Sequence, residues 1–108
     1  MPKYVFISGP YTIGDMAQNV RDAILAADTL AIAGFIPFIP HLNHFWHFLC
    51  PHDIYFWYQY DFAWLEKCDC LVRLAGESPG ADREVIQAQK LGIPVYFSVA
   101  ECVGLAFA

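Results

Sequence analysis

Glu84 is a carboxylate placed where it could act as a nucleophile. It follows the small-residue loop Ser78-Pro79-Gly80-Ala81, and the sequence predicts that it opens a helix. Free backbone N–H groups and the helix dipole favour a negative charge at such a position, so we expect the carboxylate to stay ionised and fixed in direction. The alternative is that Asp82 and Glu84 are ordinary first-turn acids that only stabilise the helix.

A second carboxylate, Asp61, lies in a predicted helix beside large apolar side chains. Trp57 precedes it by four residues, while Trp64 and Leu65 follow it by three and four, which places all of them on one helical face. Partial burial there would raise the pKa of the carboxyl group and suit it to protonate a leaving base. The alternative is a surface Asp at the edge of an aromatic stripe.

Three histidines and a cysteine at steps of three suggest zinc ligands: His41, His44, His47 and Cys50. Each step of three turns a helix by about 300°, so the first and last of them would face opposite sides. The paired spacing of known zinc ligands is also missing. We therefore expect no metal and no cofactor, and we expect the histidines to belong to a subunit interface or a base-stacking wall.

Charge and composition narrow the class of ligand and partner. The net charge of −5 and the lack of any Lys/Arg cluster argue against binding of duplex nucleic acid and favour a small-molecule ligand. A chain of 108 residues predicts one domain over 1–108. Its 57% hydrophobic and 17% aromatic residues leave apolar surface to cover, which predicts a homodimer or larger assembly. Neither a signal peptide nor a membrane span is predicted, so the expected location is cytoplasmic.

The elements that must position these residues alternate between strand and helix. Strands are predicted at Tyr4–Ile7, Phe35–Ile39, Cys70–Leu74 and Ile93–Phe97. Helices are predicted from Asp15 to Gly34, from Asp53 to Lys67, and, after a loop from Ala75 to Ala81, through Glu84 to Gly92. No pattern emerges from His41 to Pro51, and the residues from Val99 look too few for another full unit.

Smaller signals refine these elements. Asp15 is predicted to cap the first helix with Gln18 as its capping-box partner, and Pro37 places its strand at a sheet edge because proline lacks an N–H. All four cysteines are interpreted as reduced core residues.

The alternation predicts an α/β fold with a small parallel sheet and helices on both faces, a flavodoxin-like or Rossmann-like three-layer sandwich. Ligands in such folds bind beyond the carboxyl ends of the strands. We therefore expect Ser8–Thr12, Pro40–His44 and Ala75–Glu84 to meet.

Four segments, taken in order, resemble the nucleoside 2-deoxyribosyltransferase superfamily, which includes the 2′-deoxynucleoside 5′-phosphate N-hydrolases. They are Tyr4–Tyr11, Asp61–Asp69, Ser78–Glu84 and Gly92–Val95. The resemblance implies that Glu84 is the nucleophile, that Asp61 serves acid/base and base-recognition roles, and that Tyr11 contacts substrate. In such enzymes the glutamate attacks the anomeric carbon, and water or a second base then releases the sugar ester.

Three positions bear on the substrate that the resemblance implies. Ser78 stands where members acting on free nucleosides have an aspartate and nucleotide hydrolases have a serine, which can donate to a phosphate without repelling it. Asp82 replaces a frequent second glycine, and Thr12 or its neighbours stand where phosphate-cleaving members carry an arginine.

The predicted substrate-binding residues are Ser8, Gly9, Tyr11, Thr12, His41, Trp57, Ser78, Gly80 and Asp82. With Glu84 and Asp61 as the catalytic pair, the leading hypothesis is an N-hydrolase of a (2′-deoxy)nucleoside 5′-monophosphate. The alternatives are a 2-deoxyribosyltransferase acting on free 2′-deoxynucleosides and a non-catalytic nucleotide-binding sensor.

Overall fold

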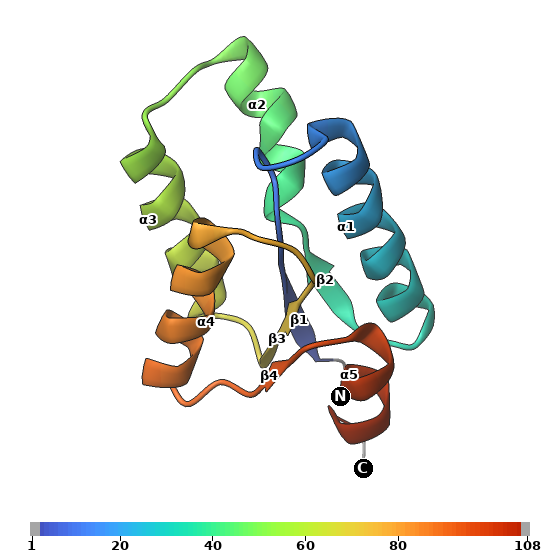
Figure 1. The fold of residues 1–108 in the computed structure, drawn as a ribbon. Helices are drawn as coiled ribbons and strands as arrows, with labels where there is room; N and C mark the ends of the chain where they lie inside the picture. The colour runs from blue at the N-terminus through green and yellow to red at the C-terminus, as the bar shows by residue number, and fades with distance from the viewer. Residues whose placement is uncertain (1–2, 107–108) are drawn as a thin grey trace.

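Four parallel strands form the centre of the computed structural model, which describes residues 3–106. They run across the sheet in the order β2 (Ile36–Phe38), β1 (Tyr4–Ser8), β3 (Cys70–Arg73) and β4 (Val95–Tyr96). Two helices cover one face, α1 (Met16–Ile32) and α5 (Val99–Ala106), and two cover the other, α3 (Ile54–Leu65) and α4 (Pro79–Lys90) (Figure 1). The protein is therefore an α/β three-layer sandwich of the predicted class.

Both faces of the sheet are buried, and successive residues of β1 serve opposite faces. Val5 and Ile7 belong to the apolar cluster that contains Leu30 of α1. Phe6, between them, belongs to the cluster on the other face, with Leu65 of α3. Strands covered on both sides read as unbroken apolar runs, which is why the first strand is easily recognised from sequence.

The predicted helix and strand boundaries are confirmed where a capping or turn residue marks them. The Oδ1 atom of Asp15 accepts a 3.0 Å hydrogen bond from the backbone N–H of Gln18 and so caps α1. The reciprocal half of the capping box is wrong, because the backbone N–H of Asp15 makes no hydrogen bond to the Gln18 side chain, whose Nε2 donates to Asp22. The chain turns out of α1 at Gly34, whose φ is +102°. Pro37 lies in an edge strand, as predicted.

Helical structure forms in two segments where the sequence pattern predicts none. Residues 41–51 include most of a 3₁₀ turn, η1 (Pro40–Leu42), and all of a short helix, α2 (Asn43–Leu49). No residue of α2 is buried, so it has no apolar face to give a helical period. The residues from Val99 form α5, whose Cys102 is fully buried in the cluster it shares with α1.

The cysteine prediction holds for three of the four residues. Cys68, Cys70 and Cys102 are buried, whereas Cys50, which follows α2, is exposed. All four are free thiols. Within residues 3–106 no helix combines the length and apolar character needed to cross a membrane.

Candidate active site

A pocket of about 550 Å³ lies beyond the carboxyl ends of β1 and β3. The three segments expected to meet do so here, since the loop after β1, the η1–α2 segment and the start of α4 all line it. Helix α3 supplies the remaining wall. The lining residues are Ile7, Gly9, Tyr11, Thr12, Ile13, Pro40, His41, Asn43, His44, His47, His52, Ile54, Trp57, Tyr58, Asp61, Ser78, Pro79, Gly80, Ala81 and Glu84.

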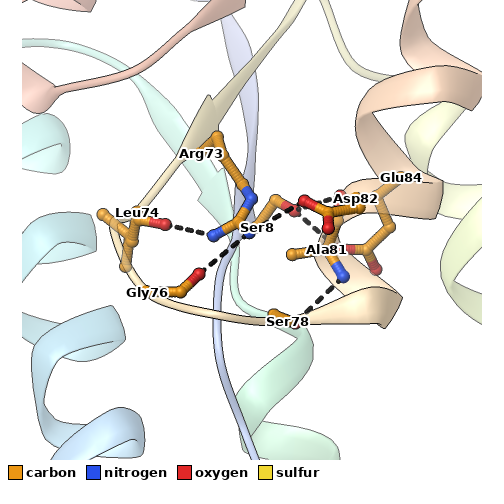
Figure 2. A network of polar contacts seen from close by, with 8 residues as sticks. All are labelled: Ser8, Arg73, Leu74, Gly76, Ser78, Ala81, Asp82 and Glu84. Atoms are coloured by element: carbon orange, nitrogen blue, oxygen red, sulfur yellow. Dashed lines mark hydrogen bonds and ion pairs between the residues drawn. The ribbon is translucent and has the colours of Figure 1, made fainter.

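Glu84 reaches this pocket from the second turn of α4, not from the helix start that the sequence predicts. The helix begins at Pro79, so the free first-turn N–H groups lie before Glu84. Its Oε1 instead accepts a 2.7 Å hydrogen bond from the hydroxyl of Ser8, a fully buried residue at the end of β1 (Figure 2). The position and direction of the carboxylate are therefore set by a strand residue.

The protonation state of Glu84 also differs from the prediction of a fully ionised group. Burial raises the pKa of Glu84 to about 8, and the nearby Asp61 charge adds to this rise. The Ser8 hydrogen bond and the positive charge of Arg73 oppose it. At neutral pH the protonated acid is therefore favoured.

Arg73, which sequence reasoning missed, organises the loop before α4. Its guanidinium donates to the carbonyl oxygens of Leu74 and Gly76 and forms a 3.0 Å ion pair with Asp82 (Figure 2). Gly76 has a φ of +118°, and a Cβ atom there would lie 2.7 Å from Pro10. The loop before α4 therefore contacts the loop after β1 at a distance that only glycine allows at position 76.

Asp61 enters the pocket from α3, one turn after Trp57, as the helical spacing predicts. Burial raises its pKa to about 7, which confirms the predicted direction. The side-chain amide of Asn43, a residue the sequence gave no reason to select, donates a 3.1 Å hydrogen bond to Oδ1 of Asp61. This leaves Oδ2 as the oxygen that can carry the exchangeable proton.

Ser78 and Gly80 form the N-terminal end of α4 at the pocket. Ser78 is the N-cap, because its hydroxyl oxygen accepts a 3.1 Å hydrogen bond from the N–H of Ala81. That leaves the hydroxyl proton of Ser78 available as a donor. Pro79 has no N–H, and a Cβ on Gly80 would meet nothing within 4 Å, so the space beside the Gly80 Cα is open.

The loop after β1 is held by two histidines. The Nε2 atom of His41 lies 3.0 Å from the carbonyl oxygen of Pro10, and burial lowers the pKa of His41, so its neutral ring donates from Nε2. The hydroxyl of Tyr11 is hydrogen-bonded to Nδ1 of His44 at the start of α2. Gly9 packs against Leu74, where a Cβ would come within 3.0 Å.

An aromatic wall closes the α2–α3 side of the pocket. Trp57 and Tyr58 line it from α3, and His47 and His52 line it from α2 and the following turn. Each histidine has its own contacts: the indole N–H of Trp57 donates to Nδ1 of His47, and the His52 ring stacks on Phe56 at 3.8 Å between centroids.

The remaining predicted site residues fall inside and outside the pocket. Thr12 lines it but is exposed, whereas Asp82 is exposed outside the lining and pairs with Arg73. Ser8 lies behind Glu84 and contacts it directly without lining the cavity. No group of three or more His, Cys, Asp or Glu side chains within residues 3–106 could hold a metal ion.

The arrangement can perform acid/base and nucleophilic chemistry on one bound molecule. Two carboxyl groups from different helices line the same pocket, and each has a pKa raised toward neutrality. One can therefore donate a proton while the other, once ionised, attacks. The pocket is large enough for a small molecule with a ring that stacks on aromatic side chains.

Comparison with known proteins identifies a family without assigning a function. No curated protein matches the chain. A family model described as "Domain of unknown function (DUF7768)" matches residues 3–98, which include every residue that lines the pocket. The chain therefore belongs to the DUF7768 family.

Proposed function

We propose that the protein hydrolyses the N-glycosidic bond of a (2′-deoxy)nucleoside 5′-monophosphate through a covalent glycosyl ester on Glu84. The observation that carries this proposal is the pair formed by Glu84 and Asp61, two carboxyl groups with raised pKa values in one pocket. The resemblance to the deoxyribosyltransferase superfamily supports the same two roles.

Each carboxyl group has one task in this mechanism. Asp61 gives its proton to a nitrogen of the leaving base as the C1′–N bond breaks, and a Glu84 oxygen forms the new bond to C1′. Water then attacks C1′, passes its proton to the Asp61 carboxylate and frees the Glu84 carboxylate. Atoms and charges balance over the two steps, and no cofactor takes part.

The nucleophile must be ionised while the acid is protonated. The raised pKa of Glu84 opposes this arrangement, whereas the Ser8 hydroxyl and the Arg73 charge favour it. Positive charge that develops at C1′ of the sugar stabilises the same carboxylate. Activity is accordingly greatest between about pH 7 and 8, and its apparent pKa values belong to the coupled pair.

The start of α4 supports a 5′-phosphate. Ser78, with its free hydroxyl proton, and Gly80, with open space beside its Cα, lie on the pocket wall that also carries Glu84. A helix N-terminus attracts anions, and a serine donates to a phosphate without repelling it.

One observation favours the second candidate, a 2-deoxyribosyltransferase acting on free 2′-deoxynucleosides. Among the residues of 3–106 that line the pocket there is no Lys or Arg to neutralise a phosphate. A free 5′-hydroxyl needs no such partner, and the same glycosyl ester would then be released by a second base.

The test is release of free base from matched nucleosides and monophosphates, each with and without a second free base. Hydrolysis of monophosphates supports the first proposal, and formation of a new nucleoside supports the second. If the wild type binds nucleosides or monophosphates but releases no base, both proposals fail and the non-catalytic nucleotide-binding sensor is supported.

A further inference from the structure

The ring of His47 has one fixed hydrogen-bonding state. Its Nδ1 atom lies 2.8 Å from the indole Nε1 of Trp57 and 3.2 Å from the backbone N of His52. Both partners can only donate, so Nδ1 must be an unprotonated acceptor. The single proton of the neutral imidazole is therefore on Nε2.

This ring also lines the pocket of the proposed catalytic pair. Because two donors already occupy Nδ1, any hydrogen bond from His47 to a ligand must be donated from Nε2. His47 belongs to the wall that also includes Trp57, and Asp61 lies one helical turn beyond Trp57. A base protonated by Asp61 would lie along this wall, with the sugar toward Glu84.

We propose that His47 selects the base of the substrate, and that its Nε2–H favours bases with an oxo group over those with an amino group at the corresponding position. This inference rests on the proposed function. A carbonyl oxygen accepts from Nε2–H, whereas an exocyclic amino group places a donor against a donor and leaves both unpaired. Sites that hydrogen-bond a polar group discriminate strongly against analogues that cannot pair with it.

The first test measures kcat/KM for two matched pairs, hypoxanthine against adenine and uracil against cytosine, each as the 2′-deoxynucleoside 5′-monophosphate. The two bases of a pair leave with different ease. The informative quantity is therefore the ratio of kcat/KM for the oxo base to kcat/KM for the amino base, in a variant relative to the wild type. In His47→Gln, whose amide can donate or accept, we expect the preference for the oxo base to fall about tenfold.

Two further variants test whether the base preference depends on the fixed Nε2–H of His47 or only on the presence of an imidazole in the wall. Trp57→Phe keeps an aromatic ring but removes the indole donor, so that only the longer hydrogen bond from the His52 backbone still holds the tautomer of His47. The oxo preference should therefore fall in part although His47 is intact. His52→Gln is the matched control. The imidazole of His52 belongs to the same wall but makes no hydrogen bond within residues 3–106, and the backbone N–H of residue 52 is kept in the variant. The preference for the oxo base should therefore not change. A loss of preference in His52→Gln equal to that in His47→Gln would overturn the inference.

A measurement without turnover distinguishes failure of this inference from failure of the proposed function. Nitrogen-15 NMR of the wild type should show His47 protonated on Nε2, and titration with free bases should show tighter binding of hypoxanthine than of adenine. A proton on Nδ1, equal affinities, or no binding of either base up to its solubility limit would overturn the inference whether or not the protein cleaves a nucleotide. Selective binding with no base release would overturn the proposed function alone.

Discussion

The hydroxyl of Ser8 and the carboxylate of Glu84 are joined by a 2.7 Å hydrogen bond between residues 76 positions apart in the chain. The bond ties the end of a central strand to the second turn of α4. Its donor is fully buried, whereas its acceptor lines the pocket. The candidate nucleophile is thus held by a residue of the central sheet.

Glu84→Gln should abolish base release and keep the fold. The amide is nearly isosteric with the acid but is a poor nucleophile, so we expect a loss of at least ~10³-fold in kcat. Glu101→Gln, the same change at an exposed position on α5, is the matched control and should retain full activity. Near-normal turnover in Glu84→Gln would rule out the covalent mechanism.

Asp61→Asn should slow turnover by an amount that depends on the leaving base. The asparagine keeps an oxygen to accept the Asn43 hydrogen bond but has no acidic proton to give. Bases that depart easily need less protonation and should lose less. The measurement is kcat for a series of bases, and equal losses across the series would show that Asp61 only positions the substrate.

Ser78→Asp should weaken cleavage of monophosphates far more than cleavage of nucleosides. A carboxylate ~4 Å from a phosphate repels it by ~4 kcal/mol per pair of unit charges at an intermediate dielectric, more than one lost hydrogen bond of ~1 kcal/mol. Aspartate is as good an N-cap as serine, so α4 should remain stable.

The quantity to measure for this variant is kcat/KM for one base as nucleoside and as monophosphate. Ser78→Ala is the control that removes the hydroxyl without adding charge, and it should change the ratio only modestly. A wild type that already prefers the nucleoside would refute the phosphate assignment and favour the transferase.

Stability should fall as pH rises, because two carboxyl groups are harder to ionise in the folded state than in the unfolded chain. The pKa of Glu84 rises from 4.5 to about 8 on folding, and that of Asp61 from 3.8 to about 7. At pH values between the unfolded-chain pKa and the folded-state pKa of each group, the folded protein binds more protons than the unfolded chain. The free energy of unfolding therefore decreases as pH rises through this range.

Urea unfolding at pH 5 and pH 8 would test this dependence. The wild type should lose at least ~1 kcal/mol over that range, and Glu84→Gln or Asp61→Asn should each lose less, because one unit of pKa shift corresponds to about 1.4 kcal/mol. A stability that rises with pH in the wild type, or one that both variants leave unchanged, would contradict these pKa directions.

The protein should be a dimer or larger, with the aromatic segment from Phe45 to Tyr60 partly buried between subunits. Phe48 and Leu49 at the end of α2 are 78% and 82% exposed, a large apolar area for one small domain. Phe48→Glu should shift the sedimentation coefficient toward the monomer. Ile32→Glu, at an equally exposed position on α1, should not. A monomeric wild type at micromolar concentration would refute the prediction.

Most of the fold was predictable because local signals agree with the tertiary structure. The apolar run from Tyr4, the Asp15 cap and the glycines after α1 and α4 each mark an element that the structure contains. The segment from His41 was not predictable, because a helix with no buried residue leaves no period in the sequence. The start of α4 had a usable signal that was missed, since serine at the N-cap followed by proline is a common helix start.

The sequence was sufficient to predict several of the residues that line the candidate site, but not which residues contact and support them. Tyr11 and Ser78 meet because they follow the carboxyl ends of parallel strands, which lie at one edge of the sheet. Glu84 and Asp61 reach the same pocket from α4 and α3. The residues that support them could not be found this way. Asn43 lies in the segment without a pattern, and Arg73 acts through a loop whose shape depends on a contact between Gly76 and Pro10.

The pairing of β1 with β3 places Ser8 directly beside Arg73. Ser8 contacts Glu84 by a hydrogen bond and Arg73 acts on it by charge, so both influences reach the candidate nucleophile from adjacent positions of one ladder. Deleting a single residue from β1 would exchange the side chains facing the two halves of the core and turn Ser8 away from α4 in the same step. A shift in the register of β1 would therefore disturb the packing of the core and the position of the Glu84 side chain together.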